Sequence, residues 1–281
     1  MDLDLSAGPS GYTRRMRPLL GTFVEIGLHP GAAEESAVRQ AFSAIEQVHR
    51  ALSFQDPGSD LSRLNRNPGE FVVLPPLALR VLRLARAMTL ASGGLFNCTL
   101  GGLLVRRGVL PDHGGGELLD AGNASDIELE GDRARLIRPV RVTLDGIAKG
   151  YAVDCAVTEL RHAGVQTGWV NAGGDLRVFG TLTLPVSRRE SDGALWPLGG
   201  VREAAIASSA VHVHANRRFP GTILRTTGLR SAPGVWSVLA RHAWRADALT
   251  KVAALAPDAS RQAVLSRLGG RLLSPVPAMS T

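Results

Sequence analysis

Lysine is rare in this chain, and one of its two lysines stands in a segment that could bind an anion. Of the 32 Lys and Arg residues, only Lys149 and Lys251 are lysines. The segment "VTLDGIAKGYAVD" (142–154) has the pattern of a strand, a glycine-containing turn and a helix. A helix start offers unpaired N–H groups and a positive dipole end, which favour phosphate. Lys149 would add charge, and Gly146 and Gly150 would allow close approach. A plain strand-to-helix connection has the same pattern.

Two further segments hold polar residues with more than one possible role. In "NAGGDLRVFG", Asn171 can bind a ligand or cap its own turn, and Asp175 can contact a ligand or remain solvated. In "ADALTK", Asp247 stands at a predicted helix start beside Thr250 and Lys251. Capping is the common role of an acidic residue there. The alternative is a hard oxygen ligand for Mg²⁺, which usually takes one or two carboxylates plus substrate phosphates.

The elements around these segments predict an α+β fold. Residues 22–28 alternate like a strand, and residues 38–52 carry apolar residues at helical spacing. A second helix is expected from 75–76 to 93–94, then a hairpin in "IELEG" and "RARLIRP", a strand in "VRVTL" and a helix over 151–162. Short strands should fill 181–245, with two short helices after them. This order lacks a regular βαβ alternation, which favours α+β.

Composition limits the classes of partner. The net charge of +7 and pI of 10.5 favour acidic ligands, but only 5% of residues are aromatic, which disfavours base stacking on nucleic acid. The two cysteines show neither metal nor redox spacing. The sequence shows no signal peptide and no apolar run long enough for an integral membrane segment, so we expect cytoplasmic residence. A start codon further upstream, with periplasmic residence, would give the same appearance.

Several segments together resemble one enzyme family. "RPLLGTFVEI", "SFQDPGSDLSRLN", "LDGIAKGYAVDCAVTELRHAGVQTGWVNAGGDLRVFG" and "ADALTK" occur in the order typical of ApbE-family FAD:protein FMN transferases. The resemblance covers roughly residues 15–270. It implies a mostly antiparallel α+β fold related to the T-fold, with a flexible leader at 1–14 and a single domain over 15–275. It also implies FAD and Mg²⁺, transfer of FMN to a Ser or Thr hydroxyl of an acceptor flavoprotein, and release of AMP.

The resemblance also implies roles for individual residues. Asp247 and Lys149 correspond to catalytic positions. The metal would be held by Asp247, by the backbone carbonyl of Ala148 and at the position of Lys251, where the family typically has Thr. The positions that correspond to FAD contacts are Phe54 beside the flavin ring, Lys149, Asn171, Gly173, Gly174, Asp175 and Thr227.

The chain also departs from the family pattern. Relatives usually carry a segment like His-x-x-Asp-Pro-x-Thr-Gly, but here Gly221 stands at the His position and Leu224 at the Asp position. Only Thr227 and Gly228 of that segment persist. Thr143 stands where an acidic residue is commoner, and Asp145 is displaced from it. These departures keep a second hypothesis open, in which the protein binds FAD without catalysing transfer.

Overall fold

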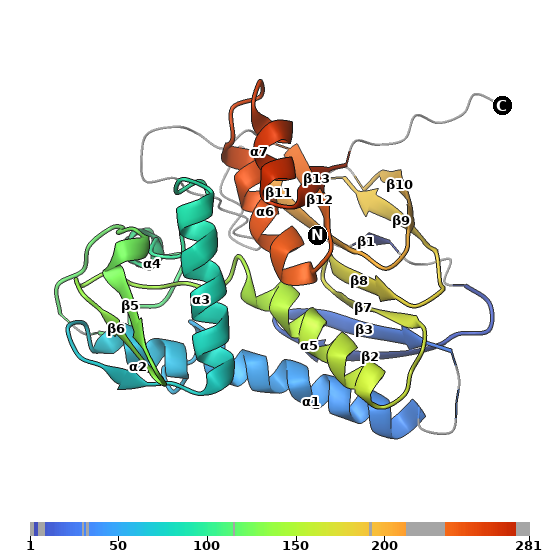
Figure 1. Ribbon diagram of the computed structural model, residues 1–281, viewed down its shortest axis with the longest axis horizontal. Helices are drawn as coiled ribbons and strands as arrows, with labels where there is room; N and C mark the ends of the chain where they lie inside the picture. The colour runs from blue at the N-terminus through green and yellow to red at the C-terminus, as the bar shows by residue number, and fades with distance from the viewer. Residues whose placement is uncertain are drawn as a thin grey trace.

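A seven-stranded antiparallel sheet forms the centre of the computed structural model (Figure 1). The structure describes residues 3–4, 9–29, 31, 34–114, 116–190, 193–211 and 234–273. The strands lie in the order β13 (Gly270–Leu272), β12 (Gly234–Ala240), β11 (Ala205–Val211), β8 (Asp175–Phe179), β7 (Gly168–Ala172), β3 (Thr22–Leu28) and β2 (Thr13–Leu19). Hairpin connections join β2 to β3 and β7 to β8, and the register pairs Glu25 with Asn171 and Asp175 with Ala207.

Both faces of the central strands of this sheet are covered. One face packs on α1 (Glu34–Leu52), α5 (Ala148–His162) and α6 (Ala243–Leu255), and α1 and α5 run side by side in Figure 1. The other face packs around the buried Trp169 against a small sheet made of β1 (Leu3–Asp4), β9 (Leu184–Arg189) and β10 (Leu195–Val201). Every residue of β7 is therefore buried, because a strand covered on both faces has no solvent side.

A smaller lobe lies beside the sheet, at the left of Figure 1. It contains α2 (Asp60–Arg66), α3 (Pro76–Ala91), α4 (Gly101–Arg106), the 3-10 turn η1 (Ala124–Asp126) and a sheet of β4 (Val72–Val73), β6 (Arg133–Leu136) and β5 (Ile127–Glu130). Apolar residues of the lobe belong to the same buried core as α1 and α5. The helix α7 (Arg261–Arg267) packs on α6 and β13.

Most predicted elements are confirmed, with three corrections. The strand at 22–28, the two early helices and the hairpin of residues 127–136 are present. "VRVTL" is wrong as a strand, since it makes only an isolated bridge between Leu100 and Arg141. The amide of Asn65 instead bonds the backbone N–H and C=O of Val142, both at 2.8 Å, and so satisfies that backbone without a neighbouring strand.

The other two corrections concern helix starts. The helix α5 begins at Ala148, three residues earlier than expected, and α6 begins at Ala243, so Asp247 lies in its second turn. The segment before Thr13 includes the short strand β1. Within the described ranges, no helix has both the length and the apolarity to span a membrane.

Candidate functional site

The first turn of α5 contacts α6 directly, through a glycine. The N–H of Gly150 donates to Asp247 Oδ2 at 3.3 Å. A Cβ atom at position 150 would lie 2.3 Å from the backbone O of Ala243, so only glycine allows the two helices to come this close. The tertiary structure thus brings the turn around Ala148 and the carboxylate of Asp247 together, although they are about a hundred residues apart in the sequence.

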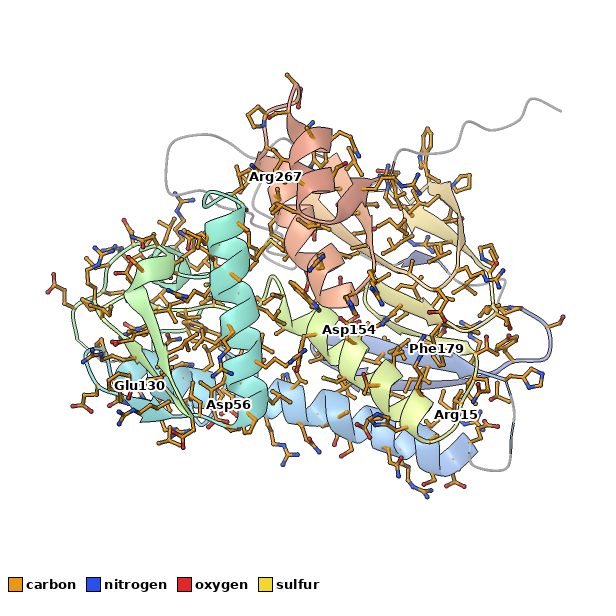
Figure 2. All side chains as sticks on the ribbon, in the orientation of Figure 1. Arg15, Asp56, Glu130, Asp154, Phe179 and Arg267 are labelled. Atoms are coloured by element: carbon orange, nitrogen blue, oxygen red, sulfur yellow. The ribbon has the colours of Figure 1, made fainter. Side chains whose placement is uncertain are left out.

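A second carboxylate fixes the same pair of helices. Asp154 on α5 accepts from the N–H groups of Ala243 at 3.1 Å and Trp244 at 3.0 Å, and it pairs with Arg177 on β8. Figure 2 shows Asp154 below the first turn of α6. The residue that caps α6 is therefore Asp154, from another helix, and the expectation that Asp247 caps its own helix is wrong. This frees the side chain of Asp247 for other contacts.

Asp247 forms an ion pair with Lys251, one turn further along α6. The ammonium of Lys251 bonds Asp247 Oδ1 and lies 3.2 Å from the backbone O of Asp247 and 3.3 Å from Ser209 Oγ on β11. Thr250 Oγ1 donates to the backbone O of Asp247 at 2.7 Å and lies 2.7 Å from Ser209 Oγ. Asp247 is 1% exposed, and partners from α5 and α6 satisfy both of its carboxylate oxygens.

The other lysine pairs with the turn between β7 and β8. Lys149 Nζ lies 2.8 Å from Asp175 Oδ2, and its side chain is 31% exposed while Asp175 is buried. Asn171 Oδ1 accepts from the N–H of Gly174 at 3.3 Å, so this side chain stabilises its own turn. Gly173 has a φ of 55°, and a Cβ there would lie 2.5 Å from Thr22 Oγ1, which explains the need for glycine.

The charged groups of these two pairs share one electrostatic environment. Burial, reinforced by the charge of Asp247, raises the pKa of Asp175 to about 6, and Lys149 and Lys251 oppose this shift. Asp145 as a residue is exposed, but the protein around its carboxyl displaces water from that group and so raises its pKa. The negative charge of Asp247 raises the pKa further. The positive charges of both lysines lower the pKa of Asp145. We call Asp145, Lys149, Asp175, Asp247 and Lys251 the charged cluster.

Two members of this region were missed as site residues. Asp145 stands in the turn before α5, and its signal was a carboxylate next to the flexible Gly146. Ser209 is a polar residue in the mostly apolar strand "AIASSAV", and only the packing of α6 on β11 reveals its contact with Lys251.

One expected FAD contact, Phe54, is buried in the smaller lobe. The ring of Phe54 is 3% exposed and stacks on His113 with ring centroids 6.1 Å apart, in the smaller lobe. There it lines a small cavity together with Asn65 and Arg141, and His113 Nε2 lies 2.8 Å from the backbone O of Phe54. In this conformation the ring offers little surface to a flavin. Thr227, with Gly221 and Leu224, lies outside the described residues.

The residues around Asp247 do not fit a divalent cation. No group of three or more His, Cys, Asp or Glu side chains in the described part of the chain is placed to hold a metal. The expected carboxylate ligand already bonds the ammonium of Lys251 and the N–H of Gly150. A cation at Oδ1 would have to displace a side chain that carries positive charge itself.

Comparison with solved structures shows the fold. The chain is similar to the apo flavinyl transferase ApbE of Pseudomonas stutzeri, with a TM-score of 0.76, 21% identity, and coverage of 90% of this chain and 87% of the other. Similarity to the flavin transferase ApbE of Vibrio cholerae gives a TM-score of 0.74 at 20% identity, with coverage of 91% and 90%. The ApbE protein of Thermotoga maritima gives 0.75 at 20% identity, with coverage of 95% and 97%. These matches confirm the predicted α+β fold.

Comparison of sequences extends the result. A curated FAD:protein FMN transferase of Rhodobacter capsulatus is 29% identical over 177 residues. That match covers 58% of this chain and about a third of the relative's own length, 34%. A profile of the ApbE family matches residues 20–272, which include all five members of the charged cluster. The chain therefore belongs to the ApbE family.

Proposed function

We propose that this protein transfers FMN from FAD to a Ser or Thr hydroxyl of an acceptor flavoprotein and releases AMP. The observation that carries the proposal is the position of Lys149, a partly exposed ammonium in the first turn of α5, within the charged cluster. The name of the Rhodobacter capsulatus relative, FAD:protein FMN transferase, supports the same activity.

The diphosphate of FAD would be attracted by Lys149 and by the dipole of α5. The N–H groups of Ala148 and Gly150 already donate to Leu144 O at 2.8 Å and to Asp247 at 3.3 Å. The attraction of the diphosphate to this helix start therefore depends more on the ammonium of Lys149 and less on free N–H groups than the sequence suggests. An ammonium carries three donors, so Lys149 can keep Asp175 as a partner while it donates to a phosphate oxygen.

The transfer is a displacement at the phosphorus atom of the FMN half of FAD. The acceptor hydroxyl oxygen forms a bond to this phosphorus, and the bond to the bridging oxygen breaks, so that AMP leaves with that oxygen. Positive charge is needed where charge builds up on the leaving phosphate, and Lys149 and Lys251 supply it in this cluster. The hydroxyl proton needs an acceptor. Asp145 is our candidate, because it stands at an exposed position of the turn before α5 and the raised pKa of its carboxyl makes it a stronger base.

The family resemblance also implies Mg²⁺, but a cation at Asp247 would have to compete with the ammonium of Lys251 at Oδ1 and with the N–H of Gly150 at Oδ2. We therefore assign no step to a metal. In this proposal Asp247 holds Lys251 and the first turn of α5 in place, and the two ammonium groups donate hydrogen bonds to the diphosphate.

The direct test is mass spectrometry of acceptor flavoproteins after incubation with the purified protein and FAD. We expect one FMN to be added to a Ser or Thr, with an equal amount of AMP released. A matched reaction with the Lys149→Met variant should give much less product.

The second hypothesis, FAD binding without catalysis, makes a different prediction for the same reaction. It is favoured by the departures at Gly221 and Leu224 in the sequence. Tight FAD binding with neither AMP nor modified acceptor, across a panel of acceptor flavoproteins, would establish it and refute the transferase.

A further inference from the structure

The ammonium of Lys251 is held by oxygen atoms in the way that a bound cation is held. Among the described residues, three oxygen atoms contact it: Asp247 Oδ1, the backbone O of Asp247 at 3.2 Å and Ser209 Oγ at 3.3 Å. The network is closed by Thr250, whose hydroxyl lies 2.7 Å from Ser209 Oγ and donates to the same backbone O. A long flexible side chain loses entropy when it is fixed in this way, so the contacts must favour this one position.

The backbone beside Lys251 is shaped to admit its stem. A Cβ atom on Gly146 would lie 3.3 Å from Lys251 Cε and 3.7 Å from its Cδ, so glycine at this turn leaves the stem its space. The ammonium is thereby directed at Asp247, while its side chain remains 22% exposed. Most of the side chain is buried, which strengthens the electrostatic effect of the ammonium, and the exposed part leaves it open to a ligand from solvent.

We propose that Lys251 replaces the divalent cation at Asp247, so that this protein binds the diphosphate of FAD without Mg²⁺. The inference rests on the proposed function and specifies its chemistry. Threonine, the residue that the family resemblance implies at this position, offers an oxygen to a metal, whereas lysine offers a positive charge in place of one. The two arrangements exclude each other, because an ammonium and a metal cannot both occupy Asp247 Oδ1.

The first experiment measures metal binding in the absence of FAD, so it does not depend on the proposed function. Mn²⁺ is titrated into the full-length protein and followed by EPR. We expect no site in the wild type or in Lys251→Met, and a new site in Lys251→Thr. The control is Arg267→Met, which removes a charge from an exposed position on α7 (Figure 2) and should behave as the wild type does.

The second experiment measures FAD affinity by quenching of flavin fluorescence, with excess EDTA or with excess Mg²⁺. For the wild type we expect the two dissociation constants to agree within about twofold, well below the tenfold change that corresponds to one strong interaction. Lys251→Thr should bind weakly in EDTA and recover in Mg²⁺. Lys251→Met should bind about 10- to 100-fold more weakly than the wild type in both, as expected when one charged contact to the ligand is lost.

The outcomes separate this inference from the proposed function. Mn²⁺ binding by the wild type, or wild-type FAD affinity that requires Mg²⁺, overturns the inference and leaves the transferase proposal standing. Failure of Lys251→Thr to gain a Mn²⁺ site also overturns it. Absence of FAD binding by the wild type refutes the proposed function, while the Mn²⁺ titration still decides the metal question. Because Lys251→Met leaves Asp247 buried and unpaired, Asp247→Asn/Lys251→Met serves as a second variant, with the same expected results.

Discussion

The ammonium of Lys149 lies 2.8 Å from the carboxylate of Asp175, and this ion pair joins the first turn of α5 to the turn between β7 and β8. A second pair, Asp247 with Lys251, lies on α6, and Asp247 also accepts a hydrogen bond from α5 at Gly150. Both lysines of the chain are thus committed to buried aspartates at one site, while arginine supplies the other basic residues.

Replacing Lys149 by Met should weaken FAD binding by about 10- to 100-fold, since a charge-assisted hydrogen bond contributes about 1.5–3 kcal/mol. Flavin fluorescence quenching measures this change. Lys149→Arg keeps the charge but replaces a compact ammonium with a planar guanidinium. Its affinity for FAD should lie between those of the wild type and Lys149→Met. Wild-type affinity in Lys149→Met would remove Lys149 from the ligand site.

The raised pKa of Asp175 predicts a pH dependence of stability. The pKa of this carboxyl is about 6 in the folded protein, against an ordinary value of 3.8. At a pH between these two values, the folded state therefore holds a proton that the unfolded state has lost. The contribution of Asp175 to the free energy of unfolding must therefore fall as pH rises from about 4 to about 6, and stay constant above that.

Asp175→Asn isolates this contribution. Urea unfolding of both proteins across this pH range should show the wild type losing stability relative to the variant as pH rises, until the difference becomes constant. A difference that does not change with pH would contradict the raised pKa. Asp247→Asn should lower the pKa of Asp175 by removing a negative neighbour, and Lys149→Met should raise it.

Asp154→Ala should destabilise the fold by about 3 kcal/mol or more, because it leaves Arg177 unpaired and removes the acceptor for two N–H groups of α6. The free energy of unfolding in urea measures the loss. The control is Glu35→Ala, which breaks an exposed pair with Arg39 and should cause no measurable change. Equal effects of the two substitutions would show that Asp154 does not fix α6.

Gly150→Ala should separate α5 from α6, since the added methyl group would lie 2.3 Å from the backbone O of Ala243. We expect a loss of about 1–3 kcal/mol of stability, typical of overpacking, together with weaker FAD binding. Gly31→Ala is the matched control, because a Cβ at this exposed position meets nothing within 4 Å. A fully stable Gly150→Ala variant would contradict the close approach of the helices.

The fold could be predicted well where periodicity is strong and local. The strand at 22–28 and the helix α1 follow from the spacing of their apolar residues, and the hairpin β5–β6 from its turn. The segment 140–144 has the composition of a strand, but the backbone of Val142 at its centre bonds the side chain of Asn65 and no neighbouring strand. A distant side chain as backbone partner leaves no local signal.

The sequence by itself determined the family, the α+β class and the three segments that meet at the site, because motifs and periodicity are properties of neighbouring residues. Only the tertiary structure decided which groups pair there. Asp154 rather than Asp247 caps α6, Asp175 pairs with Lys149, and Lys251 takes the carboxylate of Asp247. Each of these choices depends on distances between α5, α6 and the central sheet, and on the high cost of a buried charge without a partner.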